Sequence, residues 1–373
     1  MVEKYYKSRI YKLKKELENK NSSSSNLIIL KDENIFYLTG FYAKDSESLL
    51  LLIDNDLYLL VNFIYLEQAK KTVRLNDLKV IQYNKNKYKK LAEILIDYNE
   101  KTIGVDGQNI NHEDFKKLAK YLSNQNKKLI SVIDTVENLR VVKDDIELYK
   151  IEKACSIVDK VFNYIINFKS SVLNDFTEIE LANEIKSKMI SFDAEGSSFD
   201  PVVANNEYSS LPHYLPSRKK IGNGIILLDF GARFDNYCSD MTRTIINGEY
   251  KNYSRFKKIY DIVLEAQNIS LDNCREGITC ADLDSKARNF IKSKGYGRNF
   301  GHGLGHGVGI EVHEKPRIGV SEKTILKENM VITIEPGIYI ENFGGVRIED
   351  LVIVKKNSIK NLYKSSKILI ELE

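Results

Sequence analysis

Cysteine is scarce in this 373-residue chain, and the spacing of the few that occur excludes one class of metal site. No two of them form a C-x-x-C pair, which a zinc site of the paired-cysteine type requires. Free, mostly buried thiols are the ordinary state of such residues in a reducing cytosol. We therefore expect no metal ligand among the four cysteines, which are Cys155, Cys238, Cys274 and Cys280.

Long apolar runs are also missing. No stretch reaches the roughly 18 apolar residues of a membrane span, and the first 20 residues have amphipathic helical spacing without the apolar centre of a signal peptide. The chain has 56 lysines and arginines against 52 acidic residues, a formal net charge of +4. A nucleic-acid footprint needs a clustered basic face rather than a small excess. We expect a cytoplasmic protein with no membrane and no nucleic-acid partner.

Proline is absent from the first 200 residues, and histidine nearly so. All five prolines and four of the five histidines lie beyond residue 200. This asymmetry predicts two halves that are built differently, and 373 residues are enough for two domains with substantial cores. We place the boundary near Arg140–Asp145, which gives domains of residues 1–140 and 141–373.

The first half alternates strand-like and helical runs. Helices are expected to about residue 19 and near 86–99 and 111–122, and the polar segment 21–26 is expected to be a connector. The acidic stretch Asp54–Asp56 between two apolar runs predicts a hairpin turn. This alternation is typical of a mixed α/β domain. The predicted strands are NLIIL, SLLLLI, LYLLV, LKVIQY, KTIGVD and KLISV.

The second half opens with a helix start signal. Asp144 and Glu147 have the spacing of a capping box. The helix that follows carries an apolar stripe that includes Ile146, Tyr149 and Ala154. Further helices are expected near 177–190, 253–271 and 280–293, between strand-like segments. The pattern predicts an α+β domain, an antiparallel sheet with helices on its outer face.

Two predicted hairpins bring acidic side chains together. Asp229 follows the apolar run IILL, and a turn near Asp235 would place Asp240 roughly opposite it, within about 5 Å between Cβ atoms. Glu335 and Glu349 flank a second turn, with two glycines near its tip. Acids embedded in such apolar strands are costly unless they are paired or bound to metal.

These acids and one histidine form a ligand set for a pair of divalent metals. Carboxylate oxygens with a single imidazole suit hard to borderline ions, which favours Mn²⁺ or Co²⁺ and leaves Zn²⁺ or Fe²⁺ as alternatives. A phosphate-loop interpretation of GHGLGHGVG is rejected because the G-x-G-x-x-G spacing and a following helix are missing. We expect its glycines to let the backbone approach a substrate. The set is Asp229, Asp240, His306, Glu335 and Glu349.

The chain resembles the pita-bread metallopeptidases, in particular the Xaa-Pro dipeptidases (prolidases) and Xaa-Pro aminopeptidases. The phrases LDFGARFDNYCSDMTRT, GHGLGHGVGIEVHE, EPGIY and GVRIED carry the resemblance, which covers nearly the whole chain. NIFYLTGFYAKDSESLLLLI and LRVVKDDIELYKIEKAC resemble the openings of the two domains. The resemblance implies a creatinase-like N-terminal α/β domain followed by a pita-bread catalytic domain, and a homodimer.

The resemblance also implies a role for each ligand. Asp229 would bind one metal with both oxygens, and Asp240 and Glu349 would bridge the two metals. His306 and Glu335 would complete the other metal. Glu335 would in addition accept and return the proton of the attacking water.

Four further residues match positions around the catalytic centre of such enzymes. His213 and His313 would contact substrate and stabilise the tetrahedral intermediate. His302 would lie outside the ligand set, near the substrate, and Arg347 would support the site.

The implied activity is hydrolysis of the Xaa-Pro bond at the amino terminus of dipeptides or short proline-containing peptides, through a metal-bridging hydroxide. Three alternatives stay open. A methionine aminopeptidase shares the ligands but needs no N-terminal domain. A creatinase-like hydrolase shares the layout but would lack the full ligand set, and a non-catalytic binding module on the same fold should also have lost ligands.

Overall fold

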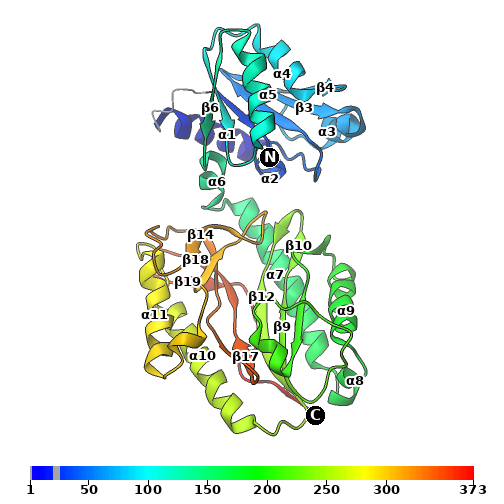
Figure 1. Ribbon diagram of the computed structural model, residues 1–373, viewed down its shortest axis with the longest axis vertical. Helices are drawn as coiled ribbons and strands as arrows, with labels where there is room; N and C mark the ends of the chain where they lie inside the picture. Colours follow the sequence, from blue (N-terminus) through cyan, green and yellow to red (C-terminus); the bar gives the residue numbers. More distant parts are fainter. Residues whose placement is uncertain (1, 20–25) are drawn as a thin grey trace. The chain divides into compact units, whose positions relative to one another are not determined.

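The computed structural model describes residues 2–19 and 26–373, so most of the predicted connector at 21–26 lies outside the described residues. The chain divides into two compact units, Met1–Arg140 and Val141–Glu373. Each unit has its own secondary structure and core, and Figure 1 colours them from blue to cyan and from green to red.

The first unit is a mixed sheet with helices. Its six strands have the order β4-β3-β2-β1-β5-β6, with antiparallel pairs in the β1–β2–β3 portion and parallel pairs elsewhere. All six predicted strands are present, as β1 (Leu27–Ile29), β2 (Leu49–Ile53), β3 (Asp56–Asn62), β4 (Leu78–Tyr83), β5 (Thr102–Asp106) and β6 (Lys128–Val132). The helical elements are α1 (Glu3–Asn19), α2 (Asp32–Thr39), η1 (Phe63–Tyr65), α3 (Leu66–Thr72), α4 (Lys87–Leu95), α5 (His112–Ser123) and α6 (Thr135–Arg140).

Local sequence determines two features of this unit. Ile53 pairs with Asp56, and Asp54 has a φ of 49°, so the predicted hairpin turn between β2 and β3 is confirmed. All five residues of β2 are buried, which explains an apolar run without alternation.

Helices cover the outside of the strands in the second unit (Figure 1). The predicted capping box is confirmed: Asp144 and Glu147 bond each other's backbone at the start of α7. The expected burial of Tyr149 is wrong, since 57% of this residue is exposed. Leu148 and Ile151 supply the buried face there instead. The helical elements are α7 (Asp145–Ile166), α8 (Ser170–Asn174), α9 (Glu178–Ser191), η2 (Asn206–Ser210), α10 (Tyr253–Asn273), α11 (Cys280–Ser293) and η3 (Gly297–Asn299).

The strands of this unit form sheets that are mostly antiparallel. Their orders are β11-β10-β7, β20-β12-β9-β8, β14-β13-β15-β18-β19 and β16-β17. A large core lies between α10, α11 and the strands beside them. Edge strands of these sheets include β7 (Gly196–Ser197), β8 (Val202–Asn205), β14 (Glu314–Ile318), β19 (Ile359–Asn361) and β20 (Glu371–Leu372).

The strand pairing of the first of two long hairpins is interrupted at the position of Asp240. β9 (Gly224–Phe230) pairs with β12 (Met241–Asn247), and β10 (Ala232–Phe234) pairs with β11 (Tyr237–Cys238) around the predicted Asp235 turn. Both ladders share one register, so Asp240 falls opposite Gly231 in the break between them. Asp229 instead pairs with Thr242. The two aspartates are therefore diagonal neighbours on one face, not opposite each other as predicted.

The second hairpin has the same construction. β15 (Val331–Ile334) pairs with β18 (Asp350–Val354), and β16 (Gly337–Ile340) pairs with β17 (Gly344–Arg347). The register is again continuous, so Glu335 and Glu349 face each other in the break. Their predicted positions on either side of one turn are thus confirmed.

Arg243 joins the two hairpins. Its guanidinium is fully buried, donates to the carbonyl of Glu349, and pairs with the Asp350 carboxylate at 2.7 Å. The Glu349 N–H donates to the carbonyl of Thr242 at 3.1 Å. Each hairpin therefore fixes the backbone of the other beside the breaks that carry acids.

The glycines on either side of His306 allow the neighbouring strands to pack closely. His306 lies in β13 (Gly305–Gly307), between β14 and β15. A Cβ on Gly305 would lie 2.1 Å from the carbonyl oxygen of Thr333, and one on Gly307 would lie 2.1 Å from that of Lys315. Packing between strands therefore requires glycine at these two positions. The expectation that the glycines of this segment let the backbone approach a substrate stays a prediction.

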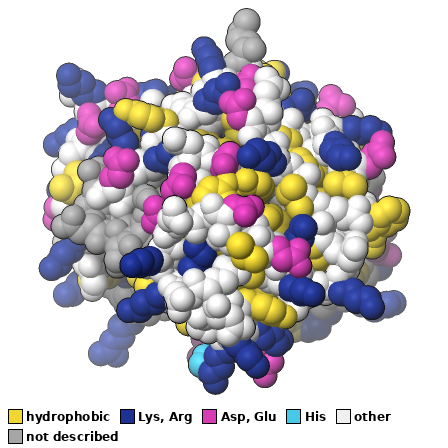
Figure 2. Space-filling view, turned by 90° about the horizontal axis from the view of Figure 1, so that it is seen from above, with side chains coloured by type: hydrophobic (Ala, Val, Ile, Leu, Met, Phe, Trp, Pro, Cys, Tyr) yellow, Lys and Arg dark blue, Asp and Glu magenta, His cyan; other side chains and the backbone are white. Residues whose placement is uncertain are grey.

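The surface shows charges of both signs. On the face seen in Figure 2, lysine and arginine side chains are interspersed with acidic ones. Among the described residues, no helix has the length and apolar character needed to span a bilayer.

Candidate metal centre

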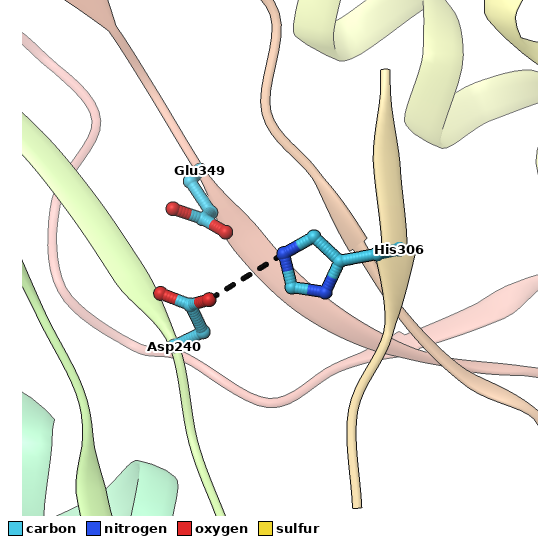
Figure 3. A group of neighbouring side chains, drawn as sticks. All are labelled: Asp240, His306 and Glu349. Carbon is cyan, nitrogen blue, oxygen red and sulfur yellow. Dashed lines mark ion pairs between the residues drawn. The ribbon is translucent and has the colours of Figure 1, made fainter. Parts of the chain in front are cut away.

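Three side chains converge in the second unit, two from the hairpin breaks and one from β13. Asp240, His306 and Glu349 each place one ligand atom within 4.8 Å of those of the other two (Figure 3). The His306 Nε2 atom is 3.6 Å from Asp240 Oδ2 and 3.3 Å from Glu335 Oε1. Four members of the predicted ligand set therefore meet around one imidazole nitrogen.

Asp229 completes the group from β9. Its Oδ2 accepts a 2.6 Å hydrogen bond from Arg347 Nη2, and Glu349 Oε2 accepts one of 2.6 Å from Thr242 Oγ1. The second oxygens, Asp229 Oδ1 and Glu349 Oε1, are buried without a hydrogen-bond partner among the described residues. A buried carboxylate oxygen without a partner is costly, and a cation removes that cost. These residues therefore fit a metal.

The His306 ring is oriented for ligation. Its Nδ1 lies 3.1 Å from the carbonyl oxygen of Gly307, which can only accept, so Nδ1 carries the proton. Nε2 then directs a lone pair toward Asp240 and Glu335. Burial lowers the pKa of His306, which favours the neutral ring that binds metals. A backbone carbonyl that fixes the tautomer is a common feature around metal-binding histidines.

The carboxyl groups are strongly coupled to their surroundings. Burial raises the pKa of Asp240 and Glu349 well above the usual range, and the neighbouring carboxylates raise both further. Burial also raises the pKa of Glu335, against the opposing effects of His302 and Arg347. Without a cation, the folded site therefore holds protons that the same groups would release in water.

Hydroxyl groups that the sequence reasoning missed fix the ligands. The Tyr363 hydroxyl accepts from the Asp240 N–H at 3.1 Å and donates to its carbonyl at 2.6 Å. Thr333 Oγ1 donates to Glu335 at 3.1 Å and accepts from the His306 N–H at 2.9 Å. A threonine two residues before a strand acid lies on the same face, so its spacing could have indicated Thr333. Nothing local indicates Tyr363.

Arg347 links the cluster to His302. Its Nη1 donates to the Tyr339 hydroxyl at 2.8 Å, and that hydroxyl lies 3.0 Å from His302 Nε2. The other nitrogen, His302 Nδ1, is 2.8 Å from the carbonyl oxygen of Gly303. Both nitrogens of His302 thus have partners outside the cluster. A chain of polar contacts through Tyr339 and Arg347 connects this ring to Asp229.

The remaining two histidines lie at an edge of the site. The His313 ring contacts the His306 ring edge-on, with centroids 4.4 Å apart. Burial, together with the nearby His306 and His213, lowers the pKa of His313 to about 4. His213 is exposed and lies within electrostatic range of His313.

Comparisons with known proteins give one consistent result. Residues 149–356 match the model of metallopeptidase family M24, and residues 9–142 match the Creatinase/Prolidase N-terminal domain. The Xaa-Pro dipeptidase of Pyrococcus furiosus is 37% identical over 366 residues, which cover 98% of this chain and 100% of that protein. These matches confirm the resemblance and the fold class expected from the sequence.

Solved structures agree with those matches. The Xaa-Pro dipeptidase from Bacillus anthracis superposes with a TM-score of 0.91 at 32% identity, covering 98% of this chain and 100% of the other. An X-Pro aminopeptidase from Thermotoga maritima superposes with a TM-score of 0.83 at 34% identity, covering 93% and 97% of the two chains.

Substitution of the two neighbouring histidines should separate a ligand from a supporting residue. His306→Ala should weaken divalent-metal binding by at least about 100-fold, because it removes the nitrogen that faces Asp240 and Glu335. His302→Ala should retain metal and lose turnover. Elemental analysis of dialysed protein measures the difference, and loss of metal from His302→Ala alone would make His302 the ligand.

Asp240→Asn should stabilise the metal-free protein at neutral pH. Burial holds the pKa of Asp240 above its unfolded value of about 3.9. Above that pH the folded metal-free state binds more protons than the unfolded chain, so its stability falls as pH rises. Asparagine cannot ionise, so the variant does not lose stability in this way as pH rises. We expect its melting temperature to be a few degrees above that of the wild type at about pH 7, and the difference to disappear near pH 4.

Calorimetry in a chelator tests this expectation. Asp261→Asn, which changes an exposed acid on α10, serves as the control and should melt like the wild type throughout. A metal-free Asp240→Asn protein that is less stable than the wild type at neutral pH would contradict the electrostatic assignment.

Proposed function

The chain belongs to metallopeptidase family M24, and we propose that this metallopeptidase cleaves the Xaa-Pro bond of dipeptides and short peptides with a free amino terminus. The observation that carries the proposal is the group of Asp240, Glu335 and Glu349 carboxylates beside His306, with the partly unpaired Asp229 carboxylate held by Arg347. Two of its carboxylate oxygens lack any other partner among the described residues. The activity itself is inferred from relatives named Xaa-Pro dipeptidase and X-Pro aminopeptidase.

We propose that five side chains hold two divalent ions, with Asp240 and Glu349 shared between them. Mostly oxygen ligands favour Mn²⁺ or Co²⁺, with Zn²⁺ or Fe²⁺ as alternatives. When bound, such ions supply a water activated at neutral pH and an electrophile for the scissile carbonyl. The five side chains are those of Asp229, Asp240, His306, Glu335 and Glu349.

The chain's own residues would handle protons and charge. Glu335 is oriented by Thr333, and the raised pKa of its carboxyl suits a group that takes a proton and returns it to the leaving nitrogen. Arg347 offsets the charge of Asp229 at 2.6 Å. We propose that the imidazole groups of His313 and His213 donate to the oxygen that becomes negative during attack. In support, the His313 ring contacts the His306 ring, and His213 lies within electrostatic range of His313.

The alternatives fit less well. A methionine aminopeptidase needs no N-terminal domain, whereas residues 9–142 match a Creatinase/Prolidase N-terminal domain. A creatinase-like hydrolase or a binding module should lack part of the ligand set, and here all five residues are retained within one buried region. Because relatives are named Xaa-Pro dipeptidase, we propose that this enzyme cleaves dipeptides better than longer peptides.

Peptide length tests the proposal. With Mn²⁺ or Co²⁺ added, the enzyme should cleave alanyl-proline and leave alanyl-alanine intact, and a chelator should abolish turnover. Alanyl-proline extended by two residues should be cleaved more slowly. Equal or faster cleavage of the extended peptide would make the enzyme an aminopeptidase. Failure to cleave either proline peptide with metal bound would refute the Xaa-Pro assignment.

A further inference from the structure

The segment that carries His213 is irregular and partly exposed. It follows η2 and runs from Leu211 to Ser217 without a helix or strand. Leu215 is 77% exposed, while Tyr214 between it and His213 is partly buried. We call Leu211–Ser217 the histidine loop. A loop of this kind holds one conformation only if something fixes it, because it has no ladder of its own.

A buried carboxylate fixes the histidine loop. Glu178, the first residue of α9, is completely buried. Its Oε2 accepts three hydrogen bonds from the loop: from Tyr214 Oη at 2.7 Å, Ser217 Oγ at 2.7 Å and the Ser217 N–H at 3.1 Å. Its Oε1 accepts from the Asn205 N–H at 3.0 Å. Hydrogen bonds to a carboxylate are shorter and stronger than neutral ones.

Packing and backbone contacts act in the same direction. The rings of Tyr208 and Tyr214 stack with centroids 5.2 Å apart and pack on the buried cluster of Val202, Ala204 and Leu227. The first N–H groups of α9 donate to the returning chain: Glu178 N to Lys219 O and Ile179 N to Ser217 O, both at 3.0 Å. Helix α9 therefore begins where the loop ends.

We propose that Glu178 is a positioning residue for His213. By holding Tyr214 and Ser217, the Glu178 carboxylate fixes the backbone that carries His213 within electrostatic range of His313. The inference rests on the proposed function, in which His213 contacts substrate. Glutamine at this position would keep the size but direct an amide N–H₂ group at hydroxyl and N–H donors, which would break up the contact set.

A matched pair of variants tests the role. Glu178→Gln and Tyr214→Phe should lower kcat/KM for a Xaa-Pro dipeptide roughly 10- to 100-fold, since a small misplacement of a catalytic group has effects of that size. Metal content should stay that of the wild type. Glu184→Gln and Tyr164→Phe remove a 2.8 Å hydrogen bond between Glu184 of α9 and Tyr164 of α7, neither of which lies in the histidine loop, and should keep wild-type activity.

Coupling to His213 distinguishes positioning from general stabilisation. In a His213→Ala background, Glu178→Gln and Tyr214→Phe should cause little further loss of kcat/KM. Losses that multiply with that of His213→Ala, or wild-type activity of both variants, would overturn the inference. If Glu178→Gln does not fold, Tyr214→Phe and Ser217→Ala carry the same test.

A readout without substrate separates this inference from the proposed function. The His213 imidazole resonance can be assigned by its loss in His213→Ala. In Tyr214→Phe it should move from its wild-type position, because the backbone that carries the ring is released, and it should stay unchanged in Tyr164→Phe. An unchanged resonance in Tyr214→Phe would overturn the inference. A metal-bound wild type that cleaves no proline peptide would instead refute the proposed function.

Discussion

The structure depends on holding several carboxyl groups close together away from water. Burial raises the pKa of Asp240, Glu335 and Glu349, and neighbouring carboxylates add to the effect. Within the protein, only part of this charge is compensated: Arg347 pairs with Asp229, and hydroxyl groups bond Glu335 and Glu349. A pair of divalent cations would supply the remaining compensation. The same charge that makes the apo site costly is what would give the ions their affinity.

Two interrupted hairpins make this concentration of charge possible. In each, the ladder stops for two pairs and resumes in the same register, which frees Asp240, Glu335 and Glu349 from regular pairing. Other groups then hold the backbone, with the Tyr363 hydroxyl on Asp240 and the Thr242 carbonyl on Glu349. Backbone fixed at these points keeps one ligand atom each of Asp240, His306 and Glu349 within 4.8 Å of the other two. Such preorganisation favours both binding and catalysis.

Much of the fold and of the site could be predicted from the sequence, because the signals were local. Apolar runs gave the six strands of the first unit, and acids directly after apolar runs indicated Asp229 and Glu335. The sequence did not reveal that Asp240 is offset by two residues from the partner of Asp229, since the pairing register depends on where the strand ladder is interrupted. Tyr363 lies 123 residues from Asp240, and Glu178 lies 36 from Tyr214. Contacts of that separation leave no periodic pattern in a single sequence.

Titration of the metal-free protein with Mn²⁺ in buffers of different ionisation enthalpy tests the central claim most directly. Two ions should bind per chain, and binding at neutral pH should release protons, because carboxyl groups with raised pKa values must ionise to become ligands. Binding without proton release, or no binding to the wild-type chain, would contradict the assignment of these buried carboxylates as the metal ligands.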